Sequence, residues 1–307
     1  MARQSSTRTI DKRSSARALD ELFLAAGTYR KSSAYRELLA FIRRFPRLAP
    51  YNAMLIHTQR PGSRLVLTAT QWEKKYRRHV KCGASPMIIM RPFGPVDFVF
   101  DISDTDGAPV PERLLNPFPV KGTVSHSAWK NLYDALGLEG VLDQTERYHV
   151  SKAGQIERLP EPLRDKRQGH SFLYCFRMTV NSRQSETESF ATMAHELGHM
   201  FCGHLGSPVR GWLPERTGLG LNEEEFEAES VAWLVCGRQG LEPNSGDYLS
   251  GYLNAHEEIP SISLEAVLKA VTVIEEMLSG RHKVQKKLIE PDDPARASYR
   301  QIALPGT

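Results

Sequence analysis

Four prolines between residues 106 and 122, in the stretch DGAPVPERLLNPFPVKG, constrain most strongly how this chain can fold. A proline fixes its own φ and donates no backbone hydrogen bond, so it is excluded from helix interiors and central strands. We therefore predict a Pro-rich linker over residues 109–122. It would separate a first domain, residues 16–108, from a second domain, residues 123–282.

The ends of the chain and its composition indicate an intracellular protein. The first residues, MARQSSTRTIDKRSSAR, are basic and Ser-rich without an apolar core, so they do not form a secretory signal. We expect residues 1–15 to be a flexible basic arm, with an organellar transit peptide as the alternative, and residues 283–307 to be a mobile tail. No stretch approaches ~18 apolar residues, so no membrane span is expected. The four cysteines form no Cys-x-x-Cys pair, which suits the reducing cytoplasm.

Charge is distributed unevenly along the chain. Residues 1–100 contain 19 Lys and Arg against 6 Asp and Glu, whereas residues 101–307 contain 21 against 30. A strongly basic half is typical of a polyanion-binding protein, so the charge favours nucleic acid as a partner. An electrostatic dimer, or a role of the charge in solubility alone, is the alternative.

Hydrophobic periodicity predicts an α+β protein. In the first domain we predict helices over residues 16–26, 32–45, 50–61 and 70–78, and strands over residues 63–69, 85–93 and 96–103. The last of these helices would begin with a capping box from Thr70 to Glu73. In the second domain we predict helices over residues 123–137, 185–201 and 222–237, a strand over residues 172–180, and a hairpin turning at Ala153 and Gly154.

The predicted helix SETESFATMAHELGHMF contains the motif His-Glu-x-x-His. It begins with a capping-box pair, Ser185 and Glu188. On a helix, His195 and His199 lie one turn apart on one face, where two neutral imidazoles can occupy two corners of a zinc tetrahedron. A surface helix with two ordinary histidines is the alternative. The preceding strand, the cap and the small Gly198 favour the metal site.

The acidic residue of the motif, Glu196, is turned about 100° from its neighbour on a helix. A carboxylate there can take a proton from a metal-activated water and transfer it to a leaving amine. We therefore predict Glu196 as the general base of a zinc-dependent hydrolase. His204 would point about 140° away from His199 if the helix continued. We do not expect it to be a ligand, although it remains an alternative.

The stretch NEEEFEAESVAWLVCG offers a third ligand. Helical phase places Glu225 and Glu229 on the apolar stripe, and Glu223 and Glu227 on the opposite side beside Arg238. Buried carboxylates are costly unless they are paired or bound to a metal. We predict Glu225 as the third ligand and Glu229 as the acceptor of a hydrogen bond from a ligand histidine. An acidic first turn that complements the helix dipole is the alternative, and it does not account for Glu229.

Cations and aromatic residues cluster in the first domain. In nucleic-acid-binding proteins such cations contact phosphates and the aromatic faces stack on unpaired bases, so binding is salt-dependent. Alternatively, the two aromatic residues, four apart on one helical face, belong to the core and the cations are merely solvated. The candidate nucleic-acid-binding residues are Trp72, Lys74, Lys75, Tyr76, Arg77, Arg78 and Lys81.

These motifs resemble the ArdC-type antirestriction proteins of conjugative plasmids over about residues 15–280. The first half resembles them in APYNAMLIHTQRPGSRLVLTATQWEKKYRRHVKCGASPMIIMRP and FVFDISDTDG, and the second half in HELGH, EFEAES and a closing helix pair. The run HELGHMFCGHLG also resembles the ImmA/IrrE metallo-endopeptidases, which cleave repressors. The family's metal pattern falls on His195, Glu196, His199, Glu225 and Glu229.

The resemblance implies an N-terminal domain that binds single-stranded DNA and a C-terminal zincin-like metallopeptidase domain with bound Zn²⁺. We therefore expect a cytoplasmic protein that binds single-stranded DNA and hydrolyses peptide bonds in a protein substrate. One alternative is a non-catalytic protein that protects entering DNA and holds a structural zinc. Another is an ImmA/IrrE-like endopeptidase. The presence of Glu196 favours an enzyme, because a purely structural site needs no general base.

Overall fold

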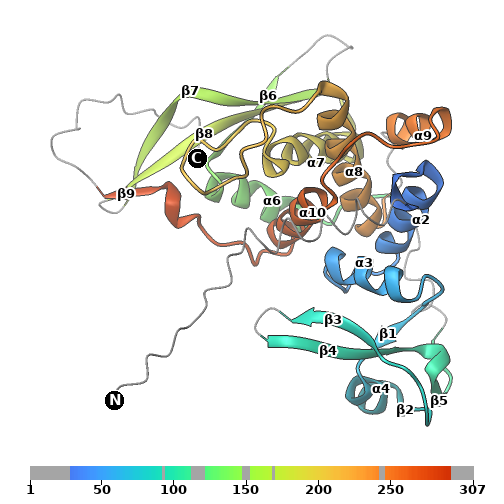
Figure 1. The fold of residues 1–307 in the computed structure, drawn as a ribbon. Helices are drawn as coiled ribbons and strands as arrows, with labels where there is room; N and C mark the ends of the chain where they lie inside the picture. Colours follow the sequence, from blue (N-terminus) through green and yellow to red (C-terminus); the bar gives the residue numbers. More distant parts are fainter. Residues whose placement is uncertain are drawn as a thin grey trace, which may run out of the picture.

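The computed structural model describes residues 28–91, 94–111, 122–146, 153–167, 170–241 and 246–291. Within these ranges the chain is a mixture of helices and sheets, as the sequence predicts (Figure 1). The predicted arm, the helix over residues 16–26 and most of the Pro-rich linker lie outside the described residues. Among the helices described, none is both long and apolar enough to cross a bilayer.

The C-terminal part is built on a four-stranded sheet in which β8 is central. Strand β6 pairs with β8 in parallel, and strands β7 and β9 pair with it antiparallel. Helices α6 and α7 pack on this sheet, and α8 and α10 pack on α7 (Figure 1). The strands are β6 (Val141–Glu146), β7 (Gly154–Arg167), β8 (His170–Asn181) and β9 (Ile289–Pro291). The helices are α6 (His126–Leu138), α7 (Glu186–Cys202), α8 (Leu221–Arg238), α9 (Gly246–Ala255) and α10 (Leu264–Leu278).

Two sequence predictions for this sheet are wrong. Gly154 is not the turn of a hairpin; it begins β7, whose antiparallel partner is the following strand β8. The predicted tail does not start at Lys283, because residues 286–288 form a 3₁₀ turn, η3, and β9 then pairs with β8. Leu288 is fully buried there. The segment is polar in composition, but Leu288 anchors it in the core and β9 adds to the sheet beside β8.

The N-terminal part consists of two helices above a small sheet and a short helix below it (Figure 1). The sheet order is β1-β4-β3, and β2 pairs separately with β5. The helices are α2 (Ser32–Arg43), α3 (Pro50–Gln59) and α4 (Ala69–Tyr76). The strands are β1 (Val66–Leu67), β2 (Arg78–Val80), β3 (Met87–Arg91), β4 (Gly94–Asp101) and β5 (Thr105–Gly107).

The capping box of α4 lies two residues before the predicted one. Thr68 accepts a hydrogen bond from the backbone N–H of Gln71, and Gln71 accepts one from the backbone N–H of Thr68. The predicted pair, Thr70 and Glu73, lies inside the helix instead. A glutamine can close the box as well as a glutamate can, so the sequence offers two overlapping signatures.

Helix α3 covers the outer edge of strand β3 with two side-chain amides. Asn52 donates to the backbone carbonyl of Met90 and accepts from its N–H, and Gln59 does the same at Ile88. The two amides are seven residues apart, which is two helical turns, and so project in the same direction. They satisfy the backbone groups that an uncovered edge strand would expose.

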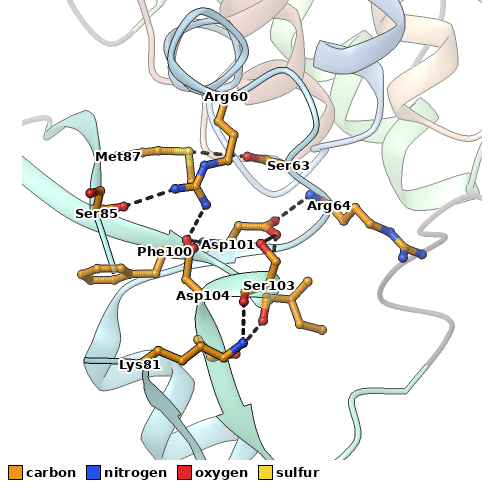
Figure 2. A network of polar contacts seen from close by, with 12 residues as sticks. Arg60, Ser63, Arg64, Lys81, Ser85, Met87, Phe100, Asp101, Ser103 and Asp104 are labelled. Atoms are coloured by element: carbon orange, nitrogen blue, oxygen red, sulfur yellow. Dashed lines mark hydrogen bonds and ion pairs between the residues drawn. The ribbon is translucent and has the colours of Figure 1, made fainter. Parts of the chain in front are cut away.

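A buried aspartate joins the loop after α3 to the sheet (Figure 2). Asp101 accepts hydrogen bonds from the backbone N–H groups of Arg64, Leu65 and Ser103. Burial raises the pKa of Asp101, but these hydrogen bonds outweigh that effect and lower it below its ordinary value. The loop therefore has a defined position, and the guanidinium of Arg64 points away from the network (Figure 2).

The two parts of the chain share a core. Tyr35 of α2 donates a hydrogen bond to Ser230 of α8 over 3.1 Å. The buried guanidinium of Arg238 is held by both carboxylate oxygens of Glu275 and by backbone carbonyls of residues 42–48. The helices that the sequence assigns to the first domain thus pack on the C-terminal helices, while the boundary at the linker remains a prediction.

Candidate metal centre and basic groove

Helix α7 presents the two histidines of the motif side by side. Ser185 and Glu188 form the predicted capping box at its start. The Nε2 atoms of His195 and His199, one turn apart, are separated by 3.1 Å. Two imidazole nitrogens that both presented lone pairs at this distance would repel each other. This arrangement therefore needs a proton or a cation between the rings.

Helix α8 brings a carboxylate to the same point. The Oε2 atom of Glu225 lies 3.4 Å from the Nε2 of His195, and its Oε1 atom lies 3.6 Å from the Nε2 of His199. The two helices can approach this closely because Gly198 has no side chain. A Cβ at that position would lie 3.0 Å from the Cα of Ala228.

The three side chains fit a divalent cation. Nitrogen and oxygen ligands bind zinc at about 2.0 to 2.2 Å, so two ligands of a tetrahedral site lie roughly 3.3 to 3.6 Å apart. The two Nε2 atoms are 3.1 Å apart, and each lies 3.4 or 3.6 Å from one of the two oxygens of Glu225, which is close to that range. Two imidazoles and one carboxylate also match the donor set of catalytic zinc sites, which keep a fourth position open.

A second carboxylate on α8 orients His195. The Nδ1 of His195 lies 3.1 Å from the Oε2 of Glu229, and Glu229 is buried. Since a carboxylate can only accept, the Nδ1 of His195 donates the hydrogen bond. Its Nε2 then faces Glu225 and His199.

Glu227 does not lie where helical phase places it. The sequence predicts an outward side chain beside Arg238, whereas Glu227 is fully buried and forms two hydrogen bonds with Arg216, of 2.6 and 2.7 Å. Burial raises the pKa of Glu227, but Arg216 and His204 outweigh that effect and lower it. From Phe226 onward, α8 is covered on nearly every side by the rest of the chain, so it has no solvent face there.

His204 is the residue near the motif whose position the sequence misjudges. Helix α7 ends at Cys202, and Gly203 adopts φ 87°, which turns the chain back. The Nδ1 of His204 consequently lies 2.9 Å from the Nδ1 of His199, and its Nε2 lies 2.9 Å from Glu227. His204 is thus no member of the group formed by His195, His199 and Glu225.

Glu196 borders the same cavity as these three side chains. This cavity of about 490 Å³ is lined by Gly154, Gln155, Ile156, His195, Glu196, His199, Leu205 and Glu225. The backbone N–H of Ile156 donates to Glu196 over 2.9 Å, so strand β7 fixes the carboxylate. A Cβ at Gly154 would lie 2.5 Å from Thr192, so only glycine lets β7 pass this close to α7.

The pKa values of the histidines reflect their crowding. Burial lowers the pKa of His195, but the hydrogen bonds to Glu225 and Glu229 outweigh it and raise this pKa to about 10. Burial and the neighbouring His195 lower the pKa of His199 to about 4. The two carboxylates therefore favour positive charge at this point of the cavity.

The predicted nucleic-acid-binding residues divide into two groups. Trp72 is fully buried and its indole N–H donates to the carbonyl of Phe100, so the prediction that it stacks on a base is wrong. Arg78 donates to backbone carbonyls of Thr105, Gly107 and Ala108 and is occupied in holding β5. Lys81 donates to the carbonyl of Ser103 (Figure 2). The exposed cations of the set are Lys74, Lys75, Arg77 and Lys81, and Tyr76 is half-buried.

A groove next to α4 brings in arginines that the sequence analysis did not select. Its volume is about 370 Å³, and Leu48, Leu65, Leu67, Ile89 and Val99 are among its apolar lining residues. Lys75 and Tyr76 line it together with Arg44, Arg47 and Arg64, and the three arginines and the lysine are exposed. Arg44 and Arg47 come from the loop after α2, Arg64 comes from the loop after α3, and Lys75 lies on α4, so the groove joins segments that are separate in the sequence.

Comparison with known proteins yields a distant likeness. No protein-family model matches the chain, and no curated protein matches it. Two crystal structures of the antirestriction protein ArdC from plasmid R388 are similar, a metal-free one at 16% identity and a Mn(II)-bound one at 18%. Both cover 88% of this chain and 98% or 99% of their own, with TM-scores of 0.37 and 0.38. A likeness at this level does not establish membership of a family.

Proposed function

We propose that this protein is a metal-dependent peptidase whose centre consists of His195, His199 and Glu225, with Glu196 as the general base. One observation carries the proposal. One ligand atom from each of His195, His199 and Glu225 lies within 4.8 Å of the other two, and Glu196 lines the same cavity. The ligand types favour Zn²⁺, since imidazole and carboxylate are its usual ligands in hydrolytic sites.

The residues around the centre suit hydrolysis of a peptide bond. A bound divalent cation supplies a Lewis acid that lowers the pKa of water and polarises a carbonyl group. Glu196 accepts the proton of the attacking water and transfers it to the leaving amine. Its hydrogen bond from the backbone N–H of Ile156 holds the carboxylate at the cavity wall. Glu229 holds the ring of His195 in the required orientation.

Metal content and peptide hydrolysis, measured on the same full-length preparations, test this proposal. We expect one equivalent of zinc by mass spectrometry in the parent and in Glu196→Gln, and none in His195→Ala. Glu196→Gln should lose hydrolysis of a fluorogenic peptide mixture. The matched control is Glu186→Gln, an exposed residue in the first turn of the same helix. Undiminished hydrolysis by Glu196→Gln would refute the assignment of the base.

A non-catalytic role predicts a different outcome of the same experiment. If the parent binds zinc and His195→Ala loses it, but neither hydrolyses any peptide, the metal is structural. The protein would then act through binding alone. The ImmA/IrrE-like alternative predicts hydrolysis that is restricted to a repressor-type protein substrate.

We further propose that the N-terminal part binds single-stranded DNA. The supporting observation is the groove, which is lined by the exposed cations Arg44, Arg47, Arg64 and Lys75 together with apolar residues and Tyr76. Cations beside apolar and aromatic surface suit a backbone phosphate and an unpaired base, respectively. The preference for single strands and a role in antirestriction rest on the sequence resemblance, and the cytoplasmic location rests on the cysteine pattern, which suits a reducing compartment.

Fluorescence anisotropy of a labelled oligonucleotide with the full-length protein tests DNA binding. Replacing Arg44, Arg47 and Arg64 together by Ala should weaken binding and flatten its salt dependence by up to about 2 log units, because each phosphate contact on a single strand contributes roughly 0.7. The control removes the same charge outside the groove, with Lys130, Lys269 and Lys283 replaced by Ala. Equal losses in both triple variants would mean that only net charge matters.

A further inference from the structure

Behind His199, a row of buried polar side chains leads away from the candidate metal centre. His204 contacts His199 through Nδ1 and Glu227 through Nε2, both over 2.9 Å. Glu227 is in turn held by two hydrogen bonds from Arg216 and by the backbone N–H of Ser263, at the start of α10, over 2.7 Å. The side chains of His204 and Glu227 are 1% and 0% exposed, so water does not compete for these contacts.

The donors and acceptors of this row can be assigned from its outer end. Glu227 receives hydrogen bonds from Arg216 and from Ser263, so it is an acceptor and the Nε2 of His204 donates to it. With a proton on Nε2, the Nδ1 of neutral His204 is an acceptor, and the Nδ1 of His199 must donate to it. The Nε2 of His199 then presents its lone pair towards His195 and Glu225.

Glu227 needs an intermediary because of its position on α8. Glu229 contacts His195 directly. Glu227 lies two residues earlier, which is about 200° around a helix, and so cannot reach the same face. His204 spans the difference, because the turn at Gly203 brings it back against the last turn of α7. A Cβ at Gly203 would lie 2.5 Å from the carbonyl oxygen of Pro214, so this turn requires glycine.

We propose that Arg216 and Glu227 act as positioning residues for His199 through His204, which sets the tautomer and the orientation of that ring. This inference rests on the proposed metal site. Arg216 also donates to the carbonyl of Cys202 over 3.0 Å, so it would join α7 to the following loop even without His204. His204 adds a connection to the candidate ligand His199, because its two ring nitrogens contact His199 and Glu227.

Metal affinity, measured on the full-length protein by competition with a chromophoric chelator for Zn²⁺, tests the proposal. Glu227→Gln and His204→Phe should weaken binding by about 10- to 100-fold, as loss of a partner to a ligand histidine does. His204→Gln, whose amide can accept from His199 and donate to Glu227, should recover most of the affinity. The matched control is Glu275→Gln, which removes the carboxylate that pairs with the buried Arg238 and should leave the affinity unchanged.

A second readout separates a positioning role from a structural one. The visible spectrum of the Co²⁺-substituted protein reports ligand geometry, and we expect it to change in His204→Phe and to return in His204→Gln. If His204→Phe does not fold, Arg216→Lys replaces it. The Arg216 side chain is 21% exposed, and the substitution should weaken the hold on Glu227 and lower zinc affinity several-fold.

The outcomes discriminate between this inference and the function on which it rests. Unchanged zinc affinity and an unchanged Co²⁺ spectrum in a folded His204→Phe protein would overturn the positioning role while leaving the metal site intact. So would equal losses in Glu227→Gln and Glu275→Gln. Failure of the parent to bind zinc, or zinc retained by His195→Ala, would instead overturn the metal site itself.

Discussion

The candidate metal centre and the basic groove lie in different parts of the chain and are built differently. The three ligand atoms of the centre project from two packed helices, and their supporting side chains are buried. The cations of the groove project from loops and from the exposed surface of α4. A helix fixes the relative directions of its side chains, whereas a loop position depends on contacts formed elsewhere. Motif spacing is therefore informative for the first region, and only net charge is informative for the second.

The largest expected effect on stability is at Trp72, and it tests whether this residue supports the fold or binds DNA. Trp72→Ala should lower the free energy of unfolding by about 3 to 5 kcal/mol, because it removes a fully buried indole. Chemical denaturation of the full-length protein measures this. The folded fraction should bind DNA as the parent does. Loss of DNA binding without loss of stability would mean that Trp72 contacts the base after all.

The next prediction tests whether the metal centre depends on the close packing of α7 and α8. Gly198→Ala places a methyl group 3.0 Å from the Cα of Ala228 and should destabilise the protein by about 1 to 3 kcal/mol. Zinc affinity should fall as well, because Glu225 is displaced from the histidines. The control is Gly251→Ala in helix α9, where a new Cβ meets nothing within 4 Å. Unchanged zinc affinity in Gly198→Ala would show that the centre tolerates a wider helix spacing.

The pH dependence of stability tests the network in Figure 2. The folded-state pKa of Asp101 is lowered, so its contribution is present above the ordinary aspartate pKa and is lost as the pH falls through the folded-state value. Asp101→Asn should cost about 1 to 3 kcal/mol at neutral pH, because it leaves buried N–H groups poorly paired. The difference from the parent should shrink below pH ~4. A difference that stays constant down to low pH would contradict the assignment.

The smallest effect on stability is expected for the exposed cations of α4. Replacing Lys74 and Lys75 by Ala should change the free energy of unfolding by no more than about 0.5 kcal/mol, as is usual for surface positions. The same variant should flatten the salt dependence of DNA binding by up to about 1.4 log units if both contact phosphates. Arg78→Ala should lower the stability and leave the salt dependence of DNA binding unchanged, since its guanidinium holds β5. An unchanged salt dependence in the lysine variant would mean that the DNA does not contact these two lysines.

Local sequence signals account for the helices and for the directions of several candidate ligands. The capping box at Ser185 and the spacing of His195 and His199 predict one face of α7, and the structure has both. Helical phase likewise directs Glu225 and Glu229 towards the histidines. These predictions depend only on the 3.6-residue repeat, which the surrounding structure does not alter.

The positions of the remaining residues in the two regions are decided only by the tertiary structure. Helical phase assigns Glu227 to solvent because it assumes that a helix has an outer face, and α8 has none from Phe226 onward. His204 reaches His199 because Gly203 reverses the chain, and Trp72 is covered because β4 lies against α4. The groove joins arginines that are up to 20 residues apart in the chain. Periodicity states which way a side chain points from its own helix. What lies in that direction is decided by the packing of the other elements.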